Sequence, residues 1–439
     1  MKSKETGVMI DIGRKYFRPA CLIRLIDIMA GLGLNTLMIH FSEDAGLGID
    51  CPAYPWLAGR DAALSPQEVK GHVDESFLSV DEVRAVVAHA AGHGIDVIPS
   101  LDSPGHLNYT VKKFNDYVAE KGALDYVLDG DTYRAEFDGG YRFFKNGTLL
   151  SFPEGTADVY GISSFYVCEG AVSRVRGTRN TSVSRGFDMA NPAAEAFIKS
   201  VIDSYAALFR SLGCDKIDIG GDELLGFGEA VVPTDILTRW QQLDSWKEAA
   251  VARSGKPTAV AYDLFVLYAN SLKARAESLG YKSVRIWNDE FRRTCDTGWT
   301  TDPALHVQFD SDFVVQYWST RALYESPASL AANGYRLINV DSVHSYYVLI
   351  ESARKDAPES YLCVNPETIK KEWSPYTFGN ITDGKPKKGY GLYSDEERSM
   401  IAGAFFCDWN DCPDLRTDDE VISELEPLLK AWASVAVYR

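Results

Sequence analysis

Two adjacent acidic residues, Asp222 and Glu223, follow Gly220 and Gly221 and are the leading candidates for acid–base chemistry. Consecutive side chains on a strand point to opposite faces, so both carboxylates can face one pocket only where the backbone bends. The two glycines permit such a bend. Two carboxylates held this close in an apolar setting take different protonation states, so one can act as an acid while the other stays ionised. A surface turn with incidental acids is the alternative interpretation of this short motif.

The elements that would position these acids are eight short apolar runs, which have the character of buried parallel strands and alternate with helical segments. The strand runs are Val8–Ile12, Thr36–Phe41, Asp96–Pro99, Lys216–Gly220, Ser283–Trp287, Phe313–Trp318, Leu337–Asp341 and Ala402–Trp409. The main helical segments are Pro19–Gly31, Ser79–Gly92, Asn191–Gly213, Val260–Gly280 and Glu420–Val437. Eight such alternations predict an α/β fold of the (β/α)8 TIM-barrel type. A doubly wound sheet is the alternative, but no glycine-rich phosphate turn follows the first run.

The chain of 439 residues is interpreted as one catalytic barrel domain over 1–439, with a long insertion at about 107–187 between the third and fourth strands. Within it, Tyr126–Ser184 is rich in Gly, Tyr, Phe, Thr and Val and is typical of β-hairpins. The insertion follows the C-terminal end of a strand, where barrel enzymes build their active sites, so we expect it to line the pocket. A homodimer, in which the insertion would reach a neighbouring subunit's pocket, is one arrangement that this length allows.

Side chains suited to binding a sugar recur where each predicted strand ends. Carboxylates accept hydrogen bonds from hydroxyl groups, and indole rings stack on the apolar face of a pyranose, whereas a phosphate site would require more lysine, arginine and bare amide groups. Because the strands are parallel, these side chains should converge on one end of the barrel. They are Asp11, Arg14, His40, Glu43, Asp44, Asp102, His106, Asp222, Glu223, Trp287, Asn288, Asp289, Glu290, Trp318, Tyr346, Tyr347, Trp409 and Asp411.

A metal site on the barrel is an alternative use of four of these residues, because His40, His106, Asp222 and Asp289 are all possible zinc ligands. However, no His-x-His closes the first strand, and no cluster of Cys and His has metal-binding spacing. We therefore expect neither a metal nor a cofactor. A metal-dependent barrel hydrolase remains the alternative, which sensitivity to EDTA would favour.

The formal net charge of -17 makes nucleic acid and anionic membrane surfaces poor partners, because like charges repel. No run of about 20 apolar residues is present to span a bilayer. The N-terminal segment MKSKETGVMIDIGR has no apolar stretch typical of a secretory signal. We therefore expect the bacterial cytoplasm as the compartment, with a secreted or periplasmic location as the alternative if the N-terminus is trimmed.

Five motifs, in order along the chain, resemble those of glycoside hydrolase family 20, the β-N-acetylhexosaminidases. The resemblance covers about residues 7–412, with the motifs on the expected strands. Within the family, the chain is most similar to the bacterial N-acetylglucosaminidase branch. Many relatives carry an additional α/β domain before the barrel, which this chain is expected to lack. The motifs are Asp11-Ile-Gly-Arg14, His40-Phe-Ser-Glu43-Asp44, Asp102-Ser-Pro-Gly-His106, Gly220-Gly-Asp-Glu223 and Trp409-Asn-Asp411.

The resemblance implies an exo-acting, retaining hydrolysis in which the substrate supplies its own nucleophile. Glu223 would protonate the glycosidic oxygen and then activate water. Asp222 would orient the 2-acetamido group, whose oxygen attacks the anomeric carbon to give an oxazolinium intermediate. The substrate would be a glycan with a terminal β-linked GlcNAc or GalNAc. A non-catalytic glycan-binding protein is the alternative, against which the intact acidic pair argues.

The resemblance also implies roles for the surrounding residues. Tyr347 would hydrogen-bond the acetamido carbonyl, and Arg14 with Asp411 would hold the hydroxyl groups of the terminal sugar. His106, with Glu43 or Asp44, would tune Glu223. At the position where the family often has Asp or Asn, this chain has Leu349, which leaves the preference between GlcNAc and GalNAc open. The remaining implied binding or supporting residues are Trp287, Asp289, Trp318, Trp409, His40 and Asp102.

Overall fold

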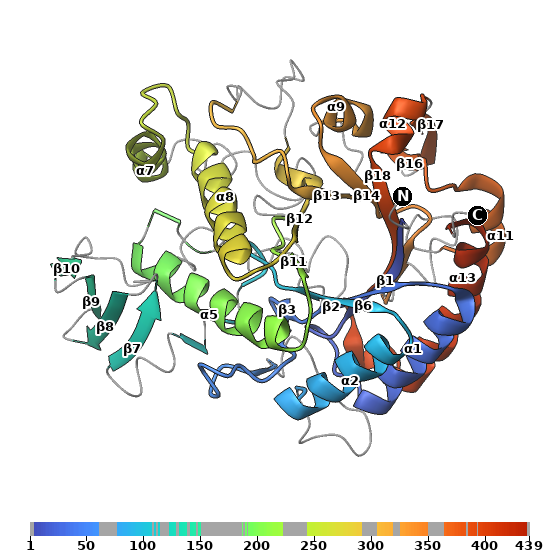
Figure 1. The fold of residues 1–439 in the computed structure, drawn as a ribbon, viewed down its shortest axis with the longest axis horizontal. Helices are drawn as coiled ribbons and strands as arrows, with labels where there is room; N and C mark the ends of the chain where they lie inside the picture. The colour runs from blue at the N-terminus through green and yellow to red at the C-terminus, as the bar shows by residue number, and fades with distance from the viewer. Residues whose placement is uncertain are drawn as a thin grey trace.

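A closed barrel of eight parallel strands forms the centre of the computed structural model (Figure 1). The structure describes residues 4–60, 77–107, 109–110, 113–114, 123–128, 131–137, 141–145, 148–150, 187, 189–190, 192–222, 244–291, 305–318, 325–349, 364–382, 385–392 and 394–436. The barrel strands, in spatial order, are β1 (Glu5–Asp11), β2 (Thr36–His40), β6 (Asp96–Ser100), β11 (Lys216–Asp218), β12 (Ser283–Trp287), β13 (Val314–Tyr317), β14 (Arg336–Asn339) and β18 (Ile401–Trp409).

The pairing of the first and last strands closes the barrel. Met9 of β1 lies opposite Met38 of β2 on one side and Cys407 of β18 on the other, in parallel register. An open, doubly wound sheet would leave these two edges unpaired. The predicted (β/α)8 barrel is therefore confirmed, and each of the eight apolar runs overlaps one strand.

The strands contribute to two separate apolar cores because their side chains alternate in direction. Met9, Met38 and Ile98 point into the barrel with Phe405 and Cys407. Their neighbours along the strands pack outward against the helices, as Val8, Ile10, Leu37, Ile39 and Val97 do. Both faces of each strand are buried, which explains why the sequence shows apolar runs without polar alternation.

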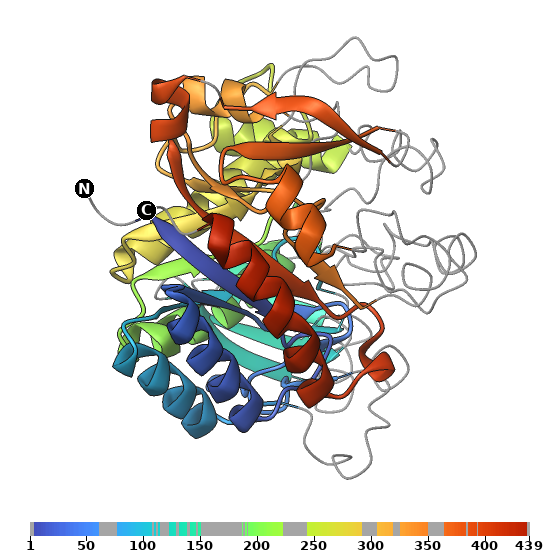
Figure 2. The same ribbon diagram turned by 90° about the vertical axis from the view of Figure 1, so that its right-hand side faces the viewer.

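The principal helices cover the outside of the barrel. They are α1 (Pro19–Leu32), α2 (Val80–Gly92), α5 (Pro192–Ser211), α8 (Asp263–Ser278) and α13 (Asp418–Ala436). Helix α2 begins with the predicted capping box, in which the Ser79 hydroxyl accepts from the Glu82 amide and the Glu82 carboxylate accepts from the Ser79 amide. Helices α1, α2 and α13 lie side by side along one flank, with α1 between the other two (Figure 2).

Shorter elements occur between the barrel strands. Strand β15 (Tyr346–Val348) pairs in parallel with the end of β18, beyond the point where β14 stops. Shorter pieces are β3 (Ser42–Glu43), β4 (Gly46–Leu47), β5 (Gly59–Arg60), α7 (Asp244–Ser254), α9 (Pro327–Ala332), α11 (Pro366–Glu372), β16 (Thr377–Thr382), β17 (Lys385–Gly391), α12 (Asp395–Ser399) and the two 3-10 turns Asn288–Glu290 and Pro413–Leu415.

Part of the insertion at about 107–187 is described. Strands β7 (Ala123–Leu128), β8 (Asp131–Phe137), β9 (Tyr141–Lys145) and β10 (Thr148–Leu150) form an antiparallel sheet in the order β10-β9-β8-β7. Residues 151–186 lie outside the described residues. The β-rich character of the whole insertion and its place beside the pocket therefore stay predictions, as does the assignment of 1–439 to a single domain. Among the described helices, none combines the length and apolar composition needed to cross a membrane.

Gly403, on β18, tests how closely the barrel strands approach each other, and Gly31, on helix α1, serves as the comparison. A Cβ at Gly403 of β18 would meet the backbone oxygen of Glu5, which cannot move without breaking strand pairing, whereas a Cβ at Gly31 of α1 would meet open space. We expect Gly403→Ala to lower the free energy of unfolding by about 1–3 kcal/mol. We expect Gly31→Ala to raise it by about 0.5–1 kcal/mol, because alanine favours the helix. Urea denaturation of the two variants measures both effects; equal stabilities would contradict this account of the barrel seam.

Candidate active site

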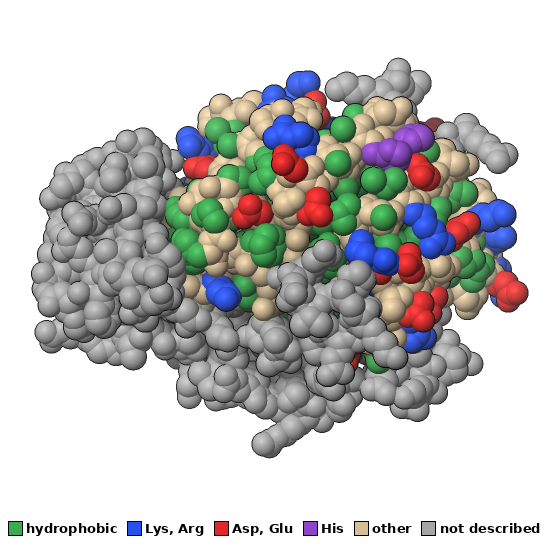
Figure 3. All heavy atoms as spheres, turned by 90° about the horizontal axis from the view of Figure 1, so that it is seen from below, with side chains coloured by type: hydrophobic (Ala, Val, Ile, Leu, Met, Phe, Trp, Pro, Cys, Tyr) green, Lys and Arg blue, Asp and Glu red, His purple; other side chains and the backbone are tan. Residues whose placement is uncertain are grey.

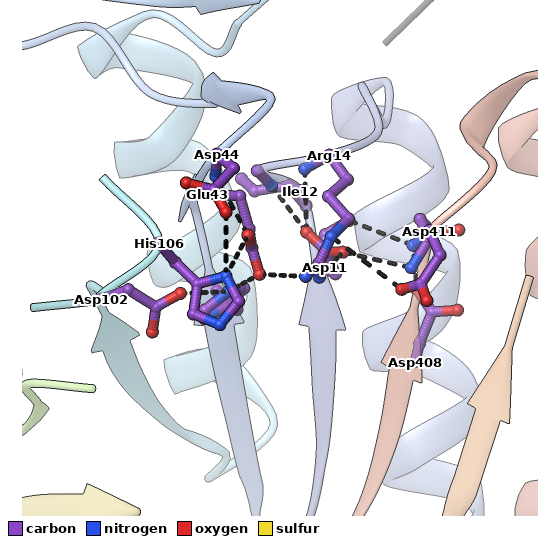
Figure 4. Close-up of polar contacts among 12 residues, drawn as sticks. Asp11, Ile12, Arg14, Glu43, Asp44, Asp102, His106, Asp408 and Asp411 are labelled. Atoms are coloured by element: carbon purple, nitrogen blue, oxygen red, sulfur yellow. Dashed lines mark hydrogen bonds and ion pairs between the residues drawn. The ribbon is translucent and has the colours of Figure 1, made fainter. Parts of the chain in front are cut away.

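A network of buried charges joins the ends of β1, β2 and β18 (Figure 4). The Asp11 carboxylate accepts from the backbone amides of Gly13, at 3.0 Å, and Arg14, at 2.9 Å, which fixes the turn after β1. This turn aims the Arg14 guanidinium at three carboxylates: Asp11 at 3.0 Å, Glu43 at 2.6 Å and Asp411 at 3.9 Å. Burial lowers the pKa of Arg14, but Glu43 and Asp11 more than offset it and raise that pKa well above its ordinary value. Arg14 is therefore a permanent cation at this end of the barrel.

His106 lies at the centre of the acidic groups. Its Nδ1 is 3.1 Å from Glu43 Oε2 and 3.4 Å from Asp44 Oδ2, and its Nε2 is 3.7 Å from Asp222 Oδ2. His106 has a φ of 51°, which is unusual for a residue with a Cβ and marks a conformation that its surroundings impose. Both acids of the β2 motif thus meet this histidine. Burial raises the pKa of Glu43, but Arg14 and His106 hold it well below its ordinary value, so Glu43 is ionised.

His40, a second buried histidine, extends the network into the barrel interior. His40 Nε2 lies 3.3 Å from Glu43 Oε1 and 3.2 Å from Asp102 Oδ2, and its Nδ1 is 2.9 Å from Ser100 Oγ. The Ser100 hydroxyl donates to Asp218 Oδ2 at 2.6 Å. Burial lowers the pKa of His40, but Asp102 and Glu43 raise it well above its ordinary value. A charged His40 donates from both ring nitrogens, which fits its contacts on both sides.

The sequence did not predict the contacts among Ser100, Asp218 and Gln316, which continue this network into the barrel. Asp218 also accepts from the Gln316 amide at 2.9 Å, and Ser100, Asp218 and Gln316 are all fully buried. Burial raises the pKa of Asp218 to about 7, with a contribution from Asp102 that Ser100, His40 and Arg285 oppose. The sequence gives a signal only at Gln316, the one polar residue of β13, because an apolar strand buries a polar side chain only if a partner is supplied. Ser100 and Asp218 are the last residues of their strands, where polar side chains are unremarkable.

Aromatic side chains pack together beside this charged network. Trp318 stacks on Tyr346 with ring centroids 6.2 Å apart, and Trp409 lies 5.9 Å from both Tyr346 and Trp287. The Trp318 indole N–H donates to Asp289 Oδ2 at 2.5 Å, and its backbone amide donates to Asn288 Oδ1 at 2.9 Å. Trp409 also contacts the charged network, because its ring lies 5.2 Å from His40 and 5.3 Å from the Arg14 guanidinium. The three tryptophans and the acids therefore share one end of the barrel.

The structure places Tyr347 differently from the sequence expectation. The Tyr347 hydroxyl donates to Glu424 Oε2 of α13 at 2.6 Å, and its ring packs in the outer core, as does Leu349. Tyr346 and Val348 face the barrel interior with the tryptophans. Strand alternation is the cause, since neighbouring residues of β15 point to opposite faces. Of the two tyrosines, Tyr346 therefore packs beside the tryptophans, and Val348 faces the barrel interior instead of Leu349.

The acidic pair follows β11 after a bend. Gly220 and Gly221 have φ values of 76° and 96°, and a Cβ at Gly220 would collide with the backbone of Asp102 and Ser103. The bend expected from the two glycines is therefore present. Asp222 is buried and faces His106. Glu223 lies outside the described residues.

Two groups in this region have ligand atoms within 4.8 Å of one another: His40 with Glu43 and Asp102, and Glu43 with Asp44 and His106. The set considered from the sequence, with Asp222 and Asp289, is not such a group among the described residues. Both groups share Glu43, whose carboxylate already forms an ion pair with the Arg14 guanidinium at 2.6 Å. The contacts of 3.1–3.4 Å between the histidines and acids are those of ion pairs, so the arrangement suits proton transfer and orientation.

The chain matches the family model described as "Glycosyl hydrolase family 20, catalytic domain" over residues 6–433. A β-hexosaminidase of Vibrio furnissii is 31% identical over 153 residues, which are 32% of this chain and 25% of that protein. A lacto-N-biosidase of Bifidobacterium bifidum is 22% identical over 430 residues, which are 97% of this chain and 27% of that protein. The matched parts thus span about a quarter of these two relatives. The crystal structure of Dispersin B has the same fold, with a TM-score of 0.61, 19% identity and 99% of each chain covered.

The buried Asp218 should make stability depend on pH. Its pKa of about 7 lies above the value near 3.9 of an unfolded chain, so the folded protein keeps a proton that the unfolded chain has lost. The resulting stability is full below pH 4 and is lost as pH rises toward 7, at up to about 1.4 kcal/mol per pH unit. We expect urea denaturation from pH 5 to 8 to show this loss in the wild type relative to Asp218→Asn.

The exposed Asp81→Asn variant controls for the removal of one carboxyl group, since the Asp81 side chain is 95% exposed. A constant difference in unfolding free energy between wild type and Asp218→Asn, from pH 5 to pH 8, would show that Asp218 stays ionised in the fold.

Proposed function

We propose, from the premise that this chain belongs to glycosyl hydrolase family 20, that it is an exo-acting, retaining β-N-acetylhexosaminidase that removes a terminal β-linked GlcNAc or GalNAc from glycans. The observation that carries the proposal is the meeting of Asp222, His106 and the three tryptophans at one end of the barrel. That set combines a placed carboxylate, a histidine held by acids and an apolar wall suited to an acetamido methyl group and a sugar face.

In the proposed mechanism the substrate's acetamido oxygen attacks the anomeric carbon while Glu223 protonates the departing oxygen. Asp222 accepts the acetamido N–H and stabilises the positive oxazolinium ring that forms. Glu223 then removes a proton from the water that opens this ring. The ion pairs of His106 with Glu43 and Asp44 support this role, because they fix the imidazole whose Nε2 faces Asp222.

Tyr346 takes the role that the sequence suggested for Tyr347, which is to donate a hydrogen bond to the acetamido oxygen. Its ring contacts the rings of Trp318 and Trp409, and the charge of Asp222 acts on its hydroxyl group. Burial, the Cys407 side chain and this charge keep the pKa of Tyr346 well above its ordinary value, so the hydroxyl keeps its proton and can donate it.

Arg14 and Asp411 hold the hydroxyl groups at the far side of the terminal sugar. Both lie at the end of the barrel that carries Trp409, and Arg14 is a permanent cation with directed N–H groups. Val348 offers no hydrogen bond on this side, so fewer polar groups contact the sugar's outer hydroxyls. A second candidate follows from the name of the lacto-N-biosidase relative: release of a disaccharide instead of a single sugar.

Substitution of the acidic pair tests the chemistry. We expect Glu223→Gln and Asp222→Asn each to lower kcat for 4-nitrophenyl β-GlcNAc by about 10²–10⁴-fold, because each removes a group that acts in the transition state. A thiazoline mimic of the oxazolinium ring should inhibit the wild type. Full turnover by Glu223→Gln would refute the assignment, and loss of activity in EDTA would favour a metal-dependent hydrolase.

The two adjacent tyrosines form a matched pair of variants. We expect Tyr346→Phe to lower kcat/KM by about 10–100-fold, since a hydrogen bond to a charged group contributes about 1.5–3 kcal/mol. Tyr347→Phe removes a hydroxyl group that donates to Glu424 of α13, on the outer side of the barrel, and should change kcat/KM less than about threefold. The reverse order of effects would restore Tyr347 to the pocket. A panel of chromogenic β-GlcNAc, β-GalNAc and disaccharide glycosides then separates the substrate candidates.

A further inference from the structure

A cluster of one acid and two histidines lies on the outer flank of the barrel, on α1 and α2 and outside the candidate active site. His89 and His93 are four residues apart at the C-terminal end of α2, and Asp27 belongs to the neighbouring helix α1. His89 Nε2 is 2.7 Å and His93 Nε2 is 3.5 Å from the same oxygen, Asp27 Oδ1. Figure 3 shows exposed histidine side chains close to an acidic residue on this side of the molecule.

We propose that Asp27, His89 and His93 form a surface site for one divalent transition-metal ion, of the kind that zinc, nickel and copper represent. Histidines four residues apart lie on one face of a helix and can bind one ion together. The carboxylate from the adjacent helix supplies a third ligand, so the ion would join α1 to α2. Nothing in the proposed hydrolysis requires this site.

The distances fit such an ion with small side-chain movements. Tetrahedral zinc with bonds of about 2.0–2.1 Å places its ligand atoms roughly 3.3 Å apart. The two contacts of Asp27 Oδ1, 2.7 Å to His89 and 3.5 Å to His93, lie on either side of this value, and the three ligand atoms are all within 4.8 Å of one another. The imidazole rings are tilted by 59° with centroids 4.9 Å apart, so they converge without stacking face to face.

The surroundings favour a cation. The cluster lies at the C-terminal end of α2, where the helix dipole and its terminal carbonyl groups carry partial negative charge. Two imidazoles with one carboxylate select zinc, copper or nickel over magnesium or calcium, which prefer oxygen ligands. The side chains are 32%, 40% and 54% exposed for His89, His93 and Asp27, so an ion reaches them directly and water can complete its coordination.

Isothermal titration of the full chain with ZnCl2 tests the site. We expect one saturable zinc per chain with a dissociation constant below about 100 µM, and no comparable binding of MgCl2. His89→Ala and His93→Ala should each weaken this binding at least about tenfold, whereas His306→Ala, remote from the cluster, should retain it. One equivalent of zinc should raise the Tm of the wild type by about 1–3 °C. The double variant, which combines His89→Ala with His93→Ala, should not show that rise.

Two results would overturn the proposal: no saturable zinc binding by the wild type, or equal binding by the wild type and the double variant. Zinc that bound at His40 and His106 instead would persist in the double variant and would inhibit hydrolysis. Because the double variant leaves the candidate active site intact, its hydrolytic rate also separates a failure of this proposal from a failure of the proposed function.

Discussion

The ion pairs of the buried Arg14 guanidinium hold together the end of the barrel that carries the candidate active site. A cation in a dry interior is costly unless carboxylates surround it, and Asp11, Glu43 and Asp411 supply them from β1, β2 and the segment after β18. The dependence is mutual, since Glu43 remains ionised because Arg14 and His106 are beside it. Removing Arg14 would leave three acids without their shared cation. Both the positions of these side chains and the ionised state of Glu43 would then change.

Much of the fold could be predicted from the sequence because barrel strands are buried on both faces, which leaves eight apolar runs in the chain. The same logic predicted that the candidate site residues would gather at one end of the barrel, because parallel strands end on the same side. It did not show which of Tyr346 and Tyr347 faces the barrel interior. Two identical neighbours carry no information on which faces inward, and β15 begins only after a break that follows β14 at Asn339, so the alternation of β14 cannot be continued into it.

Contacts between distant residues were also beyond sequence reasoning. Ser100 and Asp218 are 118 residues apart, and His40 and Ser100 are 60 residues apart. Each looks like an isolated polar residue until the barrel brings β2, β6, β11 and β13 together. Helices α9, α11 and α12 are five to seven residues long, too short for their amphipathic period to stand out from noise.

The pairing of β1 with β18 has a consequence for how this chain folds during its synthesis. The strand that supplies Asp11 leaves the ribosome before the other barrel strands, while β18 and Asp411 follow almost 400 residues later, as the span of 399 residues between Asp11 and Asn410 indicates. Until that last strand arrives, the nascent barrel has two open sheet edges, which invite pairing with other chains. Arg14 is then short of a carboxylate partner. Synthesis of the final strand therefore both removes the aggregation-prone edges and completes the carboxylate shell of Arg14, so a chain stalled before that strand should aggregate or bind chaperones.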